Sequence, residues 1–265
     1  MSSPFTNEAA VEVPLARAPL VKVLVQLRFP TIAKIDSIDA IAAFQEQMGA
    51  SYPILRQEQH VPLLPVGVVP PPAQVFGTVW RMTSADGTWM VVLARDFVAM
   101  ETSAYSSRAD FLQRWGEVLG ALSPAGLAPA VFDRLGIRYI DRLAEEELVN
   151  DLAQLVRPEM LGITNVDMPT GSSMLVNVTQ TQFRIDGLQL NASWGILPAK
   201  TIILQGVDPV ETRSWILDVD VFKEEQGTFD AASVVALTSE AAKRAHEFFR
   251  WTVTEEFLRR HGGDV

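Results

Sequence analysis

Apolar and polar side chains alternate along the segment from Val21 to Phe29. Apolar residues occupy every second position, and the positions between them are polar apart from Leu24. This two-residue period is typical of a half-buried strand, which we expect to begin at Leu20. Pro30 has no backbone N–H to donate to a neighbouring strand, so we expect this strand to end before it. A similar alternation from Asp133 to Leu143, with arginines on one face, predicts a second strand.

Other segments show the three-to-four-residue spacing of an amphipathic helix. This spacing predicts helices over residues 38–48, 105–122, 145–155 and 238–260. Thr238 or Ser239 is expected to cap the last helix. Near its end we expect the ion pairs Glu255–Arg259 and Glu256–Arg260, because residues four positions apart lie on the same side of a helix.

Two Asp-Gly pairs, at residues 86–87 and 186–187, each lie between strand-like runs. Asp-Gly accepts the positive φ of tight hairpin turns, so each pair predicts a hairpin. The expected strands of the first are residues 74–82 and 89–94, and those of the second are residues 173–185 and 188–197. Further strands are expected at residues 97–102, 201–204 and 215–222, and a proline-rich loop at residues 57–73.

These elements occur twice in the same order. Each copy reads strand, helix, several strands, helix, which predicts an α+β fold of two tandem β-α-β-β-β-α repeats forming antiparallel sheets backed by helices. Residues 1–18 are expected to form a flexible N-terminal arm. Residues 19–130 are then the first repeat and residues 131–265 the second, packed together as one compact unit.

Composition limits the classes of function. The chain has 22 Lys and Arg against 32 Asp and Glu, a net charge of −10 that repels phosphate backbones and anionic lipids, so we expect no nucleic-acid and no membrane partner. The absence of cysteine excludes disulfides, thiolate nucleophiles and cysteine-based metal sites. The first residues do not resemble a signal peptide, and we expect a cytoplasmic protein.

Recognisable catalytic motifs are missing. The sequence contains no G-x-S-x-G, no P-loop and no G-x-G-x-x-G pattern, and its three histidines lack the spacing of a metal clamp. We therefore expect no cofactor and no metal, and we favour a protein without enzymatic activity.

Charged residues share faces of two predicted strands. Asp218 and Asp220 lie on one face of their strand, and Arg134, Arg138 and Arg142 lie on one face of theirs. The simplest interpretation is a ladder of salt bridges between neighbouring strands. In the alternative, the two aspartates act as acid, base or metal ligands in a carboxylate-dependent enzyme of unassigned class, with or without a metal ion.

Two motifs resemble those of a sporadically distributed family of uncharacterised bacterial proteins. Residues 18–29 (APLVKVLVQLRF) are similar to its AP-x-V-E-V-x-x-x-L-R-F start, and residues 134–141 (RLGIRYID) to its R-L-G-x-R-Y-x-N centre. Lys22 replaces the usual Glu, and Asp141 the usual Asn. The resemblance implies a cytoplasmic bacterial accessory protein but no activity. The signature residues lie on strands and are Arg28, Glu101, Arg138 and Tyr139.

We expect a binding or interaction module rather than an enzyme. Arg28, Arg138 and Arg142 would line a cleft between the repeats, where a guanidinium offers a rigid fork of donors to an anionic group. Tyr139 and Glu101 are further candidates for this site. The expected partner is a small anionic ligand or another protein, and a homodimer formed through the apolar C-terminal helix is a third hypothesis.

Overall fold

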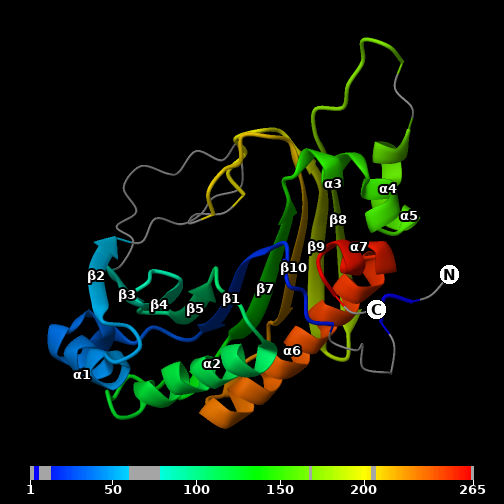
Figure 1. Ribbon diagram of the computed structural model, residues 1–265. Coiled ribbons are helices and arrows are strands. Elements are labelled where there is room, and N and C mark those ends of the chain that lie inside the picture. Colours follow the sequence, from blue (N-terminus) through cyan, green and yellow to red (C-terminus); the bar gives the residue numbers. More distant parts are fainter. Residues whose placement is uncertain (1–2, 6–12, 60–77, 167–168, 204–206, 264–265) are drawn as a thin grey trace, which may run out of the picture. The chain divides into compact units, whose positions relative to one another are not determined.

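Antiparallel sheets and helices make up the computed structural model, which describes residues 3–5, 13–59, 78–166, 169–203 and 207–263 (Figure 1). The predicted α+β class is therefore confirmed. The chain divides into two units. Unit 1 consists of Met1–Val23, Gly136–Lys223 and Ser239–Val265, and unit 2 consists of Leu24–Leu135 and Glu224–Thr238.

Unit 2 contains five strands in the order β2-β3-β4-β5-β1, with β1 contributing its residues from Leu24 onward. These strands are β1 (Leu20–Arg28), β2 (Ile54–Gln59), β3 (Thr78–Thr83), β4 (Trp89–Ala94) and β5 (Phe97–Thr102). The other elements are the 3₁₀ helix η1 (Ala33–Asp36), α1 (Ile38–Met48), α2 (Arg108–Leu122), and the short pair β6 (Val131–Phe132) and β11 (Gly227–Thr228).

The register of unit 2 aligns buried apolar residues across its strands. Met82, Val91 and Met100 stand opposite one another on β3, β4 and β5, and none of them is exposed. The other side of the same strands holds a second apolar cluster, formed by Val79, Val92, Ala94 and Phe97. Both sides of this sheet are therefore apolar, which suits the nearly continuous apolar run of β4.

Unit 1 contains β7, β10, β9 and β8 in that order. The strands are β7 (Arg134–Leu143), β8 (Asn177–Ile185), β9 (Leu188–Leu197) and β10 (Ser214–Lys223). The helices are α3 (Glu146–Asn150), α4 (Leu152–Leu155), α5 (Pro158–Leu161), the 3₁₀ helix η2 (Gly162–Asn165), the C-terminal part of α6 (Ala231–Thr252) and α7 (Glu255–Arg260).

Aromatic side chains join one side of the unit 1 sheet to α6. The Phe248 ring of α6 lies 5.9 Å from the Phe183 ring and 6.4 Å from the Trp194 ring, measured between centroids. Phe5, near the N-terminus, adds a fourth ring that contacts both Phe183 and Phe248. Because side chains alternate along a strand, the opposite side of β8, β9 and β10 holds most of their polar residues.

Several predicted elements match the structure closely. The helix at residues 38–48 and the strands at residues 89–94, 97–102 and 188–197 have the expected bounds. The last helix differs, because α6 begins at Ala231 rather than at residue 238. The Asp230 carboxylate accepts a hydrogen bond from the Ser233 N–H at 2.8 Å and caps this earlier start, whereas the Thr238 hydroxyl donates to the Val234 carbonyl inside the helix.

Four further expectations need correction. The helix expected at residues 145–155 is divided into α3 and α4, and the one expected at residues 238–260 ends at Thr252, after which Thr254 caps α7. Residues 57–59 belong to β2, a strand with too few apolar residues to show alternation. Residues 201–203 form no strand. Residues 60–77 and 204, which include parts of the predicted loop and strands, lie outside the described residues.

Both predicted hairpins are present, but their turns differ. Asp186 and Gly187 both have positive φ, 49° and 80°, and form a two-residue turn between β8 and β9. Between β3 and β4 the loop is longer, only Gly87 has positive φ, and its N–H donates to the Ser84 carbonyl at 3.0 Å. No helix in the described part of the chain has the length and apolar character needed to cross a bilayer.

Candidate functional site

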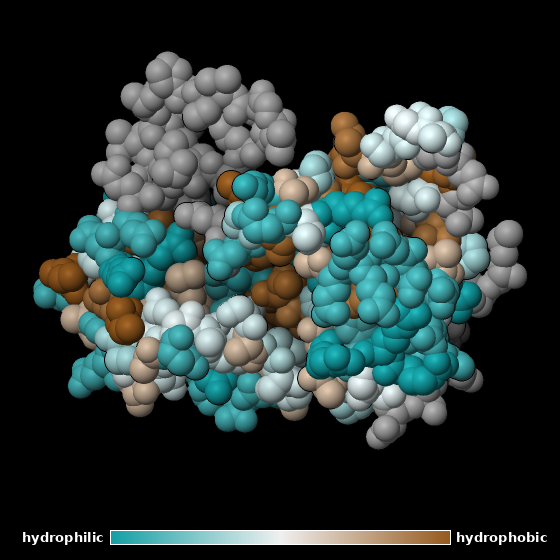
Figure 2. Space-filling model, turned by 45° about the horizontal axis from the view of Figure 1, so that its top comes forward, coloured by the Kyte–Doolittle hydropathy of each residue, from teal (hydrophilic) through white to brown (hydrophobic). Residues whose placement is uncertain are grey.

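The side of the unit 1 sheet that faces away from α6 carries polar side chains. The strand register aligns six of them in two rows across β8, β9 and β10. We call these six residues the polar face, with Gln180, Ser193 and Asp218 in one row and Gln182, Asn191 and Asp220 in the next. In Figure 2, hydrophilic residues gather on the right-hand part of the molecule, where Figure 1 shows α7 and α3 as well as β8 and β9.

A depression of about 390 Å³ lies over β8 and β9 on this sheet. Four polar-face residues line it, Gln180, Gln182, Asn191 and Ser193, together with Thr181 and Ala192. The three amide side chains are exposed. Each amide offers two N–H donors and one acceptor oxygen, so the lining presents neutral hydrogen-bonding groups of both kinds.

Arg138 of β7 and Asp218 of β10 form a two-point salt bridge at the end of the first row of the polar face. Nε of Arg138 donates to Oδ1 of Asp218 at 2.7 Å, and Nη2 donates to Oδ2 at 2.6 Å. Desolvation favours loss of the arginine proton, but hydrogen bonds and charge from Asp218, with the charge of Asp220, outweigh it and hold the pKa of Arg138 above its usual value. The expected salt bridge between these strands is therefore present, and it occupies both oxygens of Asp218.

Asp141 is a buried carboxyl on the same strand as Arg138. Its side chain is among the buried ones, with 5% of the residue exposed. Burial raises the pKa of Asp141 to about 7, and the negative charge of Asp218 adds to the effect. Near neutral pH this carboxyl is therefore divided between its protonated and ionised forms.

Arg142 is a buried cation whose contacts are neutral. Nε donates to the Ser214 hydroxyl at 3.0 Å, and Nη1 donates to the Asp208 carbonyl at 3.2 Å. Nη2 is buried and has no hydrogen-bond partner in the described structure, and burial lowers the pKa of this guanidinium. Arg142 thus differs from Arg138, whose charge is matched by a carboxylate.

The remaining candidates are divided between the units. Arg28 and Glu101 belong to unit 2, whereas Tyr139 belongs to unit 1. Arg28 lies 3.7 Å from Asp96, and both side chains are about half exposed, which makes a weak ion pair. Glu101 and Tyr139 are half-buried. A single site that unites the arginines of both predicted repeats stays a prediction.

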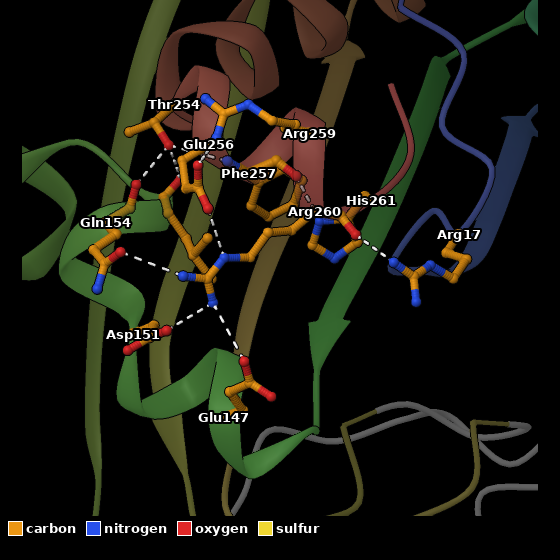
Figure 3. A network of polar contacts seen from close by, with 11 residues as sticks. Arg17, Glu147, Asp151, Gln154, Thr254, Glu256, Phe257, Arg259, Arg260 and His261 are labelled. Atoms are coloured by element: carbon orange, nitrogen blue, oxygen red, sulfur yellow. Dashed lines mark hydrogen bonds and ion pairs between the residues drawn. The ribbon is translucent and has the colours of Figure 1, made fainter. Parts of the chain in front are cut away.

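A second polar cluster connects α7 to α4 (Figure 3). The sequence predicted only one of its contacts, between Glu256 and Arg260. Arg260 donates to Glu256 at 2.8 Å, to Asp151 at 2.7 Å and to Gln154 at 3.3 Å. Nη2 of Arg17 donates to the Arg260 carbonyl at 2.7 Å. The spacing of four residues predicts the Glu256 contact, but no local pattern indicates partners more than a hundred residues away.

The described residues contain no group of three or more His, Asp or Glu side chains arranged to hold a metal ion. No protein-family model and no curated protein matches this chain.

Proposed function

We propose that this protein is a non-enzymatic binding module and that the polar face of unit 1 is its binding surface. The observation that carries this proposal is the depression over β8 and β9, which is lined by three exposed amide side chains and the half-buried Ser193. Such a lining suits a small ligand with several hydrogen-bonding groups, because each amide can donate and accept.

The buried side of the same strands gives the polar face a rigid base. Trp194 and Leu190 alternate with Ser193 and Asn191 along β9 and are 8% and 0% exposed. The Trp194 indole N–H also donates to the Met160 carbonyl at 2.9 Å. A binding surface on a strand held in this way keeps its geometry before the ligand arrives, which lowers the cost of binding.

Thermal-shift measurements test this proposal. Sugars, nucleosides, free amino acids and small carboxylates are suitable probes, and we expect at least one of them to raise the Tm of the wild type. Asn191→Ala and Gln182→Ala should each reduce that shift, whereas Gln113→Ala, which removes an exposed glutamine of α2, should retain it. An equal shift in all four proteins, or none with any probe, would contradict the proposal.

An anionic ligand at Arg142 is a second candidate. Its support is the buried Nη2 atom without a hydrogen-bond partner, on a guanidinium that no carboxylate neutralises in the described structure. Because that atom is buried, an anion could reach it only if the groups that cover it moved. Phosphate or citrate should then raise the Tm of the wild type but not that of Arg142→Met, and equal shifts in both would contradict it.

The carboxylate-dependent enzyme has less support among these contacts. Both oxygens of Asp218 are engaged by Arg138, so this carboxylate is already committed to a salt bridge rather than open for an acid, base or ligand role. If the two aspartates bind a divalent cation, Mg²⁺ or Mn²⁺ should raise the Tm of the wild type and not that of Asp220→Asn. An identical response of both proteins would remove this alternative.

We also infer that the chain arose by duplication of a β-α-β-β-β-α unit. The order β3-β4-β5-β1 in unit 2 corresponds to β8-β9-β10-β7 in unit 1, and in each case a hairpin and a third strand lead back to the first strand. A long helix follows both sets, α2 in one and α6 in the other. Domain boundaries at residues 18 and 130, and the flexibility of the arm, stay predictions.

The proposed location is the cytoplasm, and the proposed family is the sporadically distributed bacterial one. Both rest on the sequence, namely the absence of cysteine and the two motifs around Arg28 and Arg138. Fractionation of cells that express the full-length protein tests the location, and recovery in the membrane or secreted fraction would contradict it.

A further inference from the structure

β8 lies at the end of the strand order in unit 1 and pairs with β9 along its nine residues. The two-residue turn makes Ile185 and Leu188 the first pair of the hairpin, so their backbone groups point toward each other. By alternation, the N–H and C=O groups of residues 178, 180, 182 and 184 point away from β9. They form a row of hydrogen-bonding groups along the edge.

The described residues of this edge lack the prolines and repeated charges that normally prevent strands from pairing between molecules. The sequence NVTQTQFRI contains no proline, no glycine and a single charge, at Arg184. The residues leading into it are apolar and exposed: Leu175 is 74% exposed and Val176 56%, and Val178 of the strand itself is 44% exposed. Long, uncharged, exposed edges are the ones that accept a further strand.

We propose that β8 pairs in antiparallel orientation with β8 of a second copy of this chain. Pairing around Thr181 brings Gln180 opposite the second copy's Gln182, using backbone groups that point outward in both copies. Val178 then stands opposite Arg184, so the one charged residue of the strand never faces itself. The acidic residue closest to Arg184 in the sequence is Asp186, which already forms a salt bridge with Arg244 at 2.5 Å.

Two-fold pairing also explains how such an edge is tolerated. Each copy uses its single β8 edge, so the contact closes on itself and offers no further edge for growth at this end. Because nine paired residues make a small interface, we expect a reversible dimer whose population rises with concentration.

Pairing of this kind extends the proposed binding surface. Directly opposite residues of an antiparallel pair lie on the same side of a sheet, so each row of the polar face continues into the second copy, with Gln180 of one copy beside Gln182 of the other. The depression over β8 and β9 then gains a wall from the second copy. This part of the inference rests on the proposed function, whereas the pairing itself does not.

To test this pairing, charged residues are introduced on β8 and the molar mass of each protein is measured by light scattering. The wild type should approach twice the 29.2 kDa mass of one chain as its concentration rises. The variants Q180K/Q182K and Q180E/Q182E each place like charges opposite one another and should remain monomers. An equal mixture of the two should recover the dimer, because lysines then face glutamates.

Circular dichroism of each variant before mixing shows that its fold is retained. The mixture guards against a loss caused only by misfolding, because a misfolded variant cannot be rescued by its counterpart. A wild type that stays monomeric at every soluble concentration overturns the proposal. So does a dimer that persists in both charged variants, which would place the interface elsewhere, for example on the C-terminal helix.

The ligand measurements are separate from this result. A monomeric wild type that still shows the Asn191-dependent thermal shift would overturn the pairing and leave the binding face supported. A dimer without any ligand response would support the pairing and contradict the proposed binding face.

Discussion

At the residue scale, Asp141 shows how burial changes the chemistry of a side chain that the sequence presents as an ordinary carboxylate. The position on β7 is 5% exposed, and the pKa of its carboxyl is raised to about 7 from an ordinary value of 3.8. In the family that we propose from the two sequence motifs, Asn is usual at this position, and its amide does not ionise. Only the fold reveals the difference, because burial on a strand depends on what packs against it.

We predict that Asp141 makes stability depend on pH. Its folded pKa lies above the unfolded value, so its contribution is complete below pH 3.8 and is lost as pH rises through about 7. Between these pH values, the free energy of unfolding of the wild type should fall by about 1 kcal/mol per pH unit relative to that of Asp141→Asn.

Denaturant unfolding of both proteins from pH 4 to pH 8 measures this difference. Asp86→Asn is the control, because hydrogen bonds from Ser84 and Thr88 lower the pKa of Asp86 to about 2. Its effect should appear only as pH falls below about 4. Parallel profiles of wild type and Asp141→Asn above pH 4 would show that this carboxyl is not buried in its neutral form.

The salt bridge of Arg138 gives a second prediction at this scale. Asp218→Asn leaves the guanidinium without its counter-charge in a site where the two side chains are 30% and 19% exposed. We expect a loss of about 1–3 kcal/mol in the free energy of unfolding. The double variant Arg138→Met/Asp218→Leu should recover most of it, since apolar side chains need no partner.

Asp96→Asn is the matched control in denaturant unfolding. Its partner Arg28 lies 3.7 Å away and both side chains are about half exposed, so the change should stay within about 0.5 kcal/mol. If Asp218→Asn costs no more than this control, the Arg138 pair contributes nothing beyond an exposed contact.

At the element scale, the two Asp-Gly hairpins show what a dipeptide can and cannot specify. Both sites form hairpins as expected, because the glycine of each pair adopts positive φ. The sequence does not distinguish the two-residue turn at Asp186 from the longer loop before Gly87. Loop length follows from the register of the flanking strands, which depends on packing beyond the turn.

Replacement of Gly187 by Ala tests the turn geometry. The position has a φ of 80°, and no atom lies within 4 Å of the place that an alanine Cβ would occupy, so the substitution meets no steric clash with neighbouring residues. We therefore expect a purely backbone cost of about 1 kcal/mol. Gly120→Ala, in the exposed part of α2 with equally open surroundings, should stabilise by about 0.5–1 kcal/mol. The same sign for both changes in thermal unfolding would contradict this account.

The cluster around Arg260 concerns the attachment of α7 to α4 (Figure 3). Arg260→Ala removes hydrogen bonds to Asp151, Gln154 and Glu256 together. We expect a lower Tm and faster amide hydrogen exchange in α7. Among the described residues, Arg259→Ala removes a single side-chain contact, to Glu256, and should have a smaller effect on both readouts. Equal effects would show that the long-range contacts add nothing.

At the scale of the whole molecule, the strands of the two units differ in a way that the sequence already indicates. β4 is apolar almost throughout, and the structure has apolar clusters on both sides of its sheet. β9 and β10 alternate, and the structure buries one side against α6 and leaves polar residues on the other. Of the polar face, the sequence indicated only Asp218 and Asp220 on one side of their strand. The other four residues and the two rows required the strand register.

The sequence by itself determined the elements whose periodicity is strong, the hairpins at the Asp-Gly pairs, and the faces on which Arg138 and Asp218 lie. These features are local, since a side chain's neighbours within one strand or helix follow from spacing alone. The tertiary structure decided which strands became neighbours, which buried groups have partners, and that β8 is an edge. Those properties depend on contacts between residues far apart in the chain, and no local pattern encodes them.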